Sequence, residues 1–201
     1  MQCGENFKST PSLLLVRMLT RNEALALLKK NLRTKNLIKH SLAVEAILVE
    51  MAKRLGEDPE LWGLTGLLHD LDYDFTKNEP EKHSQITVKV LYDLLPAEAI
   101  NAIKAHNYQY TAQIPQTYLD KSLIAADAVS GLIIAAALVM PSKKLADVTP
   151  KTLLAKFKDK SFAAGCNRKR IELCGDMELE IQTFLELSLD ALKKVSDSLG
   201  L

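Results

Sequence analysis

Apolar residues recur every three or four positions along most of this chain, and no stretch of useful length alternates with the two-residue period of a strand. The pattern is clearest between residues 35 and 55, where Thr34 can cap a helix and Gly56 can end it. The apolar face of this segment consists of Leu37, Val44, Ile47 and Met51. The pattern therefore predicts a long amphipathic helix over 35–55 and an all-α fold.

Further helices are predicted on both sides of this segment. Thr20 and Glu23 have the spacing of a capping box and open a short amphipathic helix. Asp58 before Pro59 has the pattern of a helix cap followed by proline in the first turn. Other helices are expected over 59–68, 82–95, 96–106, 118–140 and 177–199, with a short one from Pro150, and loops over 75–81 and 108–117.

The order of these segments indicates one all-helical domain. We expect residues 1–17 to be an N-terminal extension without firm order, with Met18 as a possible alternative start of the protein. Residues 18–140 are expected to form the core of the domain. Residues 141–201 are expected to form a C-terminal helical segment that packs on the same domain.

Composition places the chain among ordinary globular proteins. Of 201 residues, 47% are hydrophobic and 5% aromatic, and the formal net charge is +1. This balance gives no support for a nucleic-acid polymer or a membrane as an obligate partner, while a homo-oligomer stays possible. The three cysteines, Cys3, Cys166 and Cys174, have no paired spacing, which favours reduced thiols and a cytoplasmic location.

Candidate chemistry lies in histidines and aspartates on otherwise apolar faces. His40 shares its helix face with Leu37 and Val44, so it should point inward. His69 and Asp70 follow each other at the end of an apolar run, where both side chains can turn toward one ion. Taken singly, an inward histidine is more often a hydrogen-bonded core residue, and a His-Asp pair is common by chance.

Asp127 is the most informative of these residues, because it lies inside the most apolar predicted helix. Burying an unpaired carboxylate is costly, and a bound cation removes that cost. The alternatives are an ion pair with Lys121 or Lys104, or a carboxylate that faces a water-filled cleft. Imidazole and carboxylate ligands together suit a divalent ion such as Mn, Fe, Co, Ni or Zn.

The order His40, then His69-Asp70, then Asp127 resembles the HD-domain superfamily of metal-dependent phosphohydrolases. The likeness covers roughly residues 35–137, and the whole chain is similar to bacterial HD-domain hydrolases of about this length. The resemblance implies an HD-domain helical bundle over 18–140, with 141–201 appended. His83 and His106 resemble the additional histidine motifs of dinuclear members, so one or two divalent ions are expected, with Asp70 between them.

The chain also departs from the family pattern. Asp72 replaces the glycine of the frequent His-Asp-Ile-Gly motif, Asn107 stands where some dinuclear members have a second histidine, and a Gly-Tyr-Pro motif is absent. We expect Asp70 and Asp72 to be catalytic, with Asp72 protonating a leaving group or orienting water. Alternatively, Asp72 and Asp74 cap a helix end and its loop.

Substrate contacts are expected from Lys104 and Asn107, beside a histidine motif, and from Lys158 and Lys160. The last two belong to a basic group that continues with Arg168, Lys169 and Arg170. Such a group can grip phosphate, although a charge run is more often a solvated surface.

Together these features predict a metal-dependent hydrolase of a small phosphorylated molecule, such as a nucleotide or another phosphoester. Two other classes fit the same ligands. One is a di-iron oxygenase built on the same framework, and the other is a binding or sensor module that keeps its metal without catalysis. Nothing in the sequence identifies the substrate.

Overall fold

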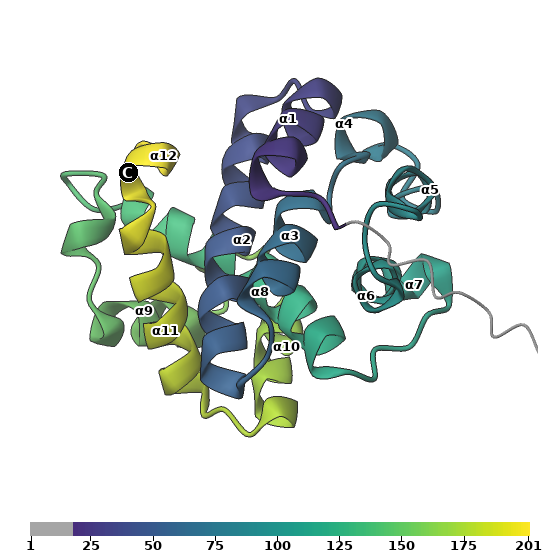
Figure 1. Ribbon diagram of the computed structural model, residues 1–201. Coiled ribbons are helices and arrows are strands. Elements are labelled where there is room, and N and C mark those ends of the chain that lie inside the picture. Colours follow the sequence, from purple (N-terminus) through teal and green to yellow (C-terminus); the bar gives the residue numbers. More distant parts are fainter. Residues whose placement is uncertain (1–17) are drawn as a thin grey trace, which may run out of the picture.

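The structure is a computed structural model that describes residues 18–201, and the predicted extension over residues 1–17 lies outside this part. The described residues form helices and connecting turns without any strand, so the predicted all-α fold is confirmed. Two long helices, α2 (Lys35–Leu55) and α8 (Tyr118–Leu138), cross the middle of the molecule and pack against each other (Figure 1).

Helix α3 (Pro59–Leu68) lies closely along α2 because glycine replaces a side chain at their contact. A Cβ atom at Gly66 would lie 3.0 Å from the backbone nitrogen of Glu45 and 3.0 Å from the backbone oxygen of Val44. Every residue from 61 to 68 is buried, so the end of α3 is held in the core. This is the end that carries His69 and Asp70.

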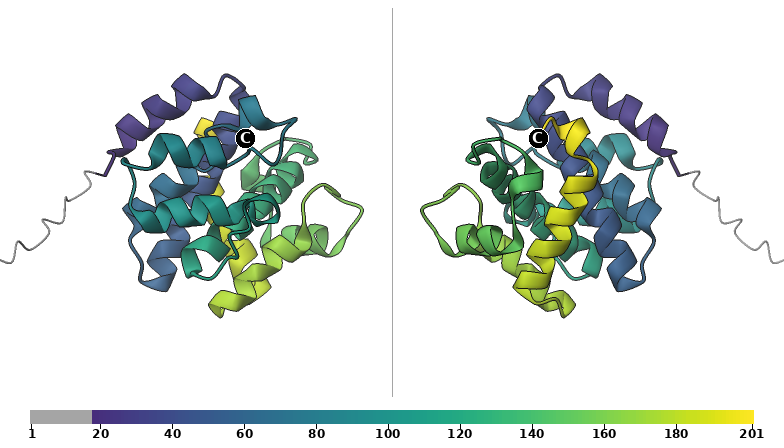
Figure 2. Two further views of the ribbon diagram at one scale, coloured as in Figure 1. Left: turned by 90° about the vertical axis from the view of Figure 1, so that its right-hand side faces the viewer. Right: turned by 90° about the vertical axis from the view of Figure 1, so that its left-hand side faces the viewer.

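The remaining helices of the N-terminal half surround this centre. Helix α1 (Arg21–Asn31) begins with the predicted capping box of Thr20 and Glu23. Helices α5 (Gln85–Leu91) and α6 (Ala97–His106) pack side by side on the flank that faces the viewer at the left of Figure 2, and α6 contacts α8.

The C-terminal part follows α8 and returns across the molecule. It consists of η1 (Leu145–Asp147), α9 (Pro150–Lys158), α10 (Arg168–Ile171), η2 (Glu172–Met177), α11 (Ile181–Lys194) and α12 (Ser196–Leu199). Helix α11 lies beside α2, as the right-hand view of Figure 2 shows, and buries Phe184, Leu185 and Leu189. Helix α10 and η2 pack on α8.

Helix boundaries differ from the prediction where polar side chains form hydrogen bonds with backbone N–H groups. The predicted helix over 82–95 is confined to α5, because Ser84 has a φ of +71° and Asp72 accepts hydrogen bonds from the backbone N–H groups of Ser84 and Thr87. The loop expected over 75–81 overlaps the short helix α4 (Tyr73–Thr76). A single helical turn, α7 (Tyr108–Thr111), likewise falls within the predicted loop over 108–117.

The predicted helix over 177–199 is also interrupted. Glu178 has a φ of +58°, which separates η2 from α11, and Val195 separates α11 from α12. Apolar spacing alone does not register such breaks, because the residues on both sides face the same core.

One described helix is long and apolar enough to cross a membrane by length and composition, namely α8. In this fold, 61% of its most apolar window is buried inside the protein. Its apolar character therefore has a structural explanation, since α8 contacts α2, α6, α9, α10 and α11.

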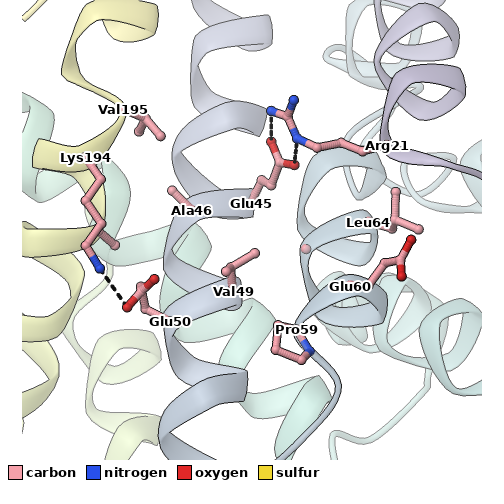
Figure 3. Close-up of a pocket in the computed structure, with 12 residues that line it drawn as sticks. Arg21, Glu45, Ala46, Val49, Glu50, Pro59, Glu60, Leu64, Lys194 and Val195 are labelled. Carbon is pink, nitrogen blue, oxygen red and sulfur yellow. Dashed lines mark hydrogen bonds and ion pairs between the residues drawn. The ribbon is translucent and has the colours of Figure 1, made fainter.

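A groove of about 280 Å³ lies between α2, α3 and α11, away from the histidines (Figure 3). Its walls are mostly apolar, and two ion pairs, Arg21 with Glu45 and Lys194 with Glu50, stand at its rim. None of the predicted site residues lines this groove.

Candidate metal centre

The fold brings all four histidines to one place. His40 comes from the first half of α2, His69 from the residue that ends α3, His83 from the turn before α5, and His106 from the last residue of α6. Neighbouring imidazole rings have centroids 4.9 to 5.3 Å apart. Four segments that are distant in sequence therefore present imidazoles to a common centre.

Asp70 lies at that centre. Its Oδ1 atom is 3.3 Å from Nε2 of His69, 3.2 Å from Nε2 of His83 and 3.4 Å from Nε2 of His106. Its Oδ2 atom is 3.7 Å from Nε2 of His40. Burial alone would raise the pKa of the Asp70 carboxyl, but the surrounding imidazoles, His69 first, hold that pKa well below its usual range.

Each histidine is fixed through its other ring nitrogen, Nδ1. The partner oxygens are the Gly66 carbonyl for His69 (2.8 Å), the Ile103 carbonyl for His106 (2.6 Å), the Asp72 carboxylate for His83 (2.8 Å) and the Ser130 hydroxyl for His40 (3.1 Å). A carbonyl can only accept, so His69 and His106 carry their proton on Nδ1 and present an Nε2 lone pair when neutral.

These lone pairs require a hydrogen-bond donor or a cation beside them. Nε2 of His69 is buried and has no hydrogen-bond partner. Nε2 of His83 lies 2.9 Å from Nε2 of His106, so a proton or another cation must sit between them. Although burial lowers the pKa of His83, its bonds to Asp70 and Asp72 raise that pKa to about 9. A proton on His83 thus satisfies the cluster, and a divalent ion fits the same donor set.

Two groups of three side chains have the spacing of a metal site, and they share Asp70. The first group is His40, His69 and Asp70, and the second is Asp70, His83 and His106. In each group the potential ligand atoms lie within 4.8 Å of one another. The two groups therefore offer two sets of possible metal ligands that share one carboxylate.

Asp127 lies beside the first group, but less deeply than its apolar helix suggests. Its Oδ1 atom is 3.2 Å from Nε2 of His40, and its side chain is 23% exposed. Lys121 pairs with Asp176 instead, and the cationic partner of Asp127 is Arg170, at 3.4 Å. Asp127 therefore lies at the wall of a cleft and does not form the ion pair with Lys121, and its role as a metal ligand stays a prediction.

His40 and Asp127 stabilise each other's charged forms. Burial lowers the pKa of His40, but the hydrogen bond from its ring to Asp127 reverses this and raises that pKa above its usual value. Burial likewise raises the pKa of Asp127, and the same bond to His40 brings it below its usual value.

Asp72 is placed behind His83 and not toward the cleft. Its carboxylate is almost fully buried and bonds to Nδ1 of His83, to the hydroxyl of Thr76 and to two backbone N–H groups of the α5 start. Asp74 accepts three hydrogen bonds from Arg33 and Thr34 in the turn between α1 and α2. Both carboxylates thus accept hydrogen bonds from backbone N–H groups, as expected if they cap helix ends and loops. Asp72 additionally orients a histidine.

The cluster opens onto a cleft of about 370 Å³. Its walls are Leu37, His40, Asp70, Tyr73, His83, His106, Asn107, Asp127 and Arg170. Of the expected substrate contacts, Asn107 lines the cleft, although its amide also donates to the carbonyls of Pro80 and His83. Lys104, Lys158 and Lys160 do not line it, and the last two are exposed.

Three cleft or cluster residues lack a specific signal in the sequence. Tyr73 packs edge-on against the ring of His83, with centroids 5.2 Å apart. Ser130 holds His40 from one turn beyond Asp127, and its position on the same helix face is the only clue. Arg170 belongs to the basic group considered above, but nothing distinguishes it there from Lys169.

The part of the sequence that forms this cluster is similar to a known protein family. The HD domain family matches residues 37–137, which span the four histidines, Asp70 and Asp127. Ribonuclease Y of Chloroflexus aurantiacus is 32% identical over 97 residues, and Ribonuclease Y of Aquifex aeolicus is 34% identical over 98 residues. No solved structure matches.

The likeness to the two ribonucleases is confined to part of each protein. It covers 48% of this chain but only 18% and 17% of the respective ribonucleases. The chain therefore spans less than a fifth of the length of the curated relatives it matches. The family match covers the helical core with the histidine cluster, and the segment that carries Arg170 lies beyond it.

Proposed function

Because this chain belongs to the HD-domain family, we propose that it is a metal-dependent phosphohydrolase that acts on a small phosphorylated molecule, such as a nucleotide or another phosphoester. One observation carries the proposal. Four imidazoles are locked through Nδ1 and direct Nε2 toward the carboxylate of Asp70, and one of these nitrogens is buried without a partner.

We propose His40, His69, Asp70 and Asp127 as ligands of a first divalent ion. His83, His106 and Asp70 would hold a second ion. Mixed imidazole and carboxylate ligands suit Mn, Fe, Co, Ni or Zn. Such an ion, when bound, polarises a phosphoryl oxygen and lowers the pKa of water near it.

The protein's own groups then position the reactants. Hydrolysis forms a bond from phosphorus to a water oxygen, breaks the bond to the leaving alcohol and delivers a proton to that alcohol. Tyr73 stands at the cleft beside His83 as a donor to the substrate, since burial and the charge of Asp70 raise the pKa of its phenol and keep it protonated. Asp72 fixes the ring of His83.

Metal analysis followed by a substrate screen tests this function. The purified protein is analysed for bound metals, loaded with each candidate ion and offered phosphomonoesters, nucleotides, dinucleoside polyphosphates, cyclic dinucleotides and a short oligoribonucleotide. We expect phosphate release from a small phosphoester, and loss of that release in the His69→Ala protein.

Oxygen uptake is measured in the same samples. Oxygen consumption with two bound irons would replace the hydrolase by an oxygenase, and bound metal without turnover of any substrate would support a binding or sensor module. Cleavage restricted to the oligoribonucleotide would assign the substrate class of the two ribonucleases instead of a small molecule.

A further inference from the structure

Resting on the proposed function, we further propose that Arg170 anchors the phosphoryl group of the substrate. We also propose that this substrate carries a single phosphoryl group and a neutral leaving group. Arg170 comes from α10, outside the part of the chain matched by the HD family. The inference therefore concerns a residue that the shared core does not supply.

The guanidinium of Arg170 is held at the cleft from two sides. Its Nη2 donates to the carbonyl of His106 at 2.9 Å, and its Nη1 lies 3.4 Å from Oδ2 of Asp127. It also lies over the ring of Tyr108, 5.9 Å from the centroid. A guanidinium has five N–H donors, so these two bonds leave others for a ligand in the cleft.

The backbone that carries Arg170 is fixed by a second arginine. Arg168 donates from its guanidinium to backbone carbonyls of the loop before α10, including those of Phe162, Ala163 and Cys166. Asn167 caps α10 through the N–H groups of Lys169 and Arg170. Arg170 is thus held in place before any ligand arrives, which reduces the entropy lost on binding.

Arg170 lines two neighbouring compartments. The first is the cleft at the histidine cluster, and the second has a volume of about 260 Å³. Both are lined by His40, Asp127 and Arg170. A phosphoryl group placed at the cluster would therefore touch Arg170, and the rest of the substrate would continue into the second compartment.

The lining of the second compartment determines the class of leaving group. Beyond the three shared residues it is formed by Ala128, Gly131, Gly165, Cys166 and Asn167. Among the described residues that line either compartment, Arg170 is the only lysine or arginine. A second or third phosphate would find no further lysine or arginine here, whereas an uncharged alcohol such as a sugar hydroxyl fits small and polar walls.

The test compares Arg170→Met with Lys169→Met, which removes the exposed neighbouring charge. Binding of inorganic phosphate to the metal-loaded proteins is measured by calorimetry. We expect Arg170→Met to weaken phosphate binding about 10- to 100-fold at unchanged metal content, and Lys169→Met to leave it unchanged. Arg170→Lys should recover only part of the loss, because an ammonium cannot form the paired hydrogen bonds of a guanidinium.

Turnover supplies the second readout. For a nucleoside monophosphate, the Arg170→Met change should lower kcat/KM by a similar factor, mainly through a higher KM. The wild type should have a higher kcat/KM for the monophosphate than for the triphosphate. Loss of metal in Arg170→Met and Arg170→Lys, or unchanged phosphate binding in both, would overturn the proposal. A preference for triphosphate or oligoribonucleotide would overturn the assigned class of substrate.

These outcomes separate the anchor from the overall function. Phosphate binding that depends on Arg170 in a protein without any hydrolysis would keep the anchor and reject the phosphohydrolase. Hydrolysis at the same rate with and without the Arg170 side chain would keep the phosphohydrolase and reject the anchor.

Discussion

The orientation of each histidine depends on one oxygen behind its ring. For His83 that oxygen belongs to Asp72, which has no contact with the cleft and therefore acts through the imidazole. Partners in this position commonly change metal affinity by 10- to 100-fold. We therefore propose Asp72 as a positioning residue whose effect is specific to the proposed second ion.

Asp72→Asn should lower the affinity for the proposed second ion about 10- to 100-fold, while the first ion, at His40 and His69, stays bound. Metal titration with atomic analysis should show stoichiometry falling from two to one. Asp74→Asn is the matched control, because its carboxylate bonds the turn at Arg33 and Thr34, away from the histidines. Equal loss of both ions would instead indicate general disruption.

Asp127→Asn tests the carboxylate at the wall of the cleft. Removing its charge should lower occupancy of the first site and turnover together. The metal-free protein should change in stability by less than about 1 kcal/mol, since the side chain is partly solvated and such pairs contribute little. Denaturation midpoints with chelator and metal content measure the two effects. Asp176→Asn, which breaks the pair with Lys121, serves as control.

Residue identity at the cluster was largely predictable, and the surrounding contacts were not. Polar residues on apolar helix faces pointed to His40 and Asp127, and family likeness added His83 and His106. Closeness to Asp70 in the sequence favours a catalytic role for Asp72, and it does not reveal that the Asp72 side chain lies behind His83. Arg170 reaches the site from a distant segment, so no local pattern could place it there.

At the level of helices, the position of the cluster depends on how closely α3 approaches α2. Gly66 serves both purposes, since its missing side chain permits the approach and its carbonyl holds His69. A substitution at Gly66 should therefore lower both the stability of the protein and its affinity for metal.

Gly66→Ala should destabilise the protein by about 1–3 kcal/mol, because the new methyl group meets backbone atoms of α2 that cannot yield. The better helix propensity of alanine offsets at most about 1 kcal/mol of this. Gly175→Ala is the control, since nothing lies within 4 Å of its would-be Cβ. Chemical denaturation compares the two, and equal stability of both variants would contradict the close contact.

Helix positions followed from apolar periodicity and end signals, which is why α2 and α3 begin and end as predicted. Failures occurred where a side chain competes for the backbone. At Ser84 the carboxylate of Asp72 stabilises a left-handed turn that no periodic pattern encodes. That turn is also what directs His83 toward Asp70, so the least predictable element is part of the site.

Across the whole molecule, the candidate ligands, Asp127 included, come from five separate segments, so a bound ion should stabilise the fold. An ion present at 100 times its dissociation constant adds about 2.7 kcal/mol to the free energy of unfolding. For a chain of this size, that corresponds to a melting temperature higher by about 5–10 °C. Thermal unfolding before and after chelation measures the shift, which should shrink in the Asp127→Asn protein.

The apolar character of α8 has a consequence during synthesis of the chain. As the chain is synthesised, α8 is complete before its partners α9, α10 and α11 exist. At about 5–20 residues per second, the nascent chain carries an apolar helix that α2 and α6 can cover only in part for several seconds. During that interval the C-terminal segment has not yet completed the core around the helix that carries Asp127 and Ser130.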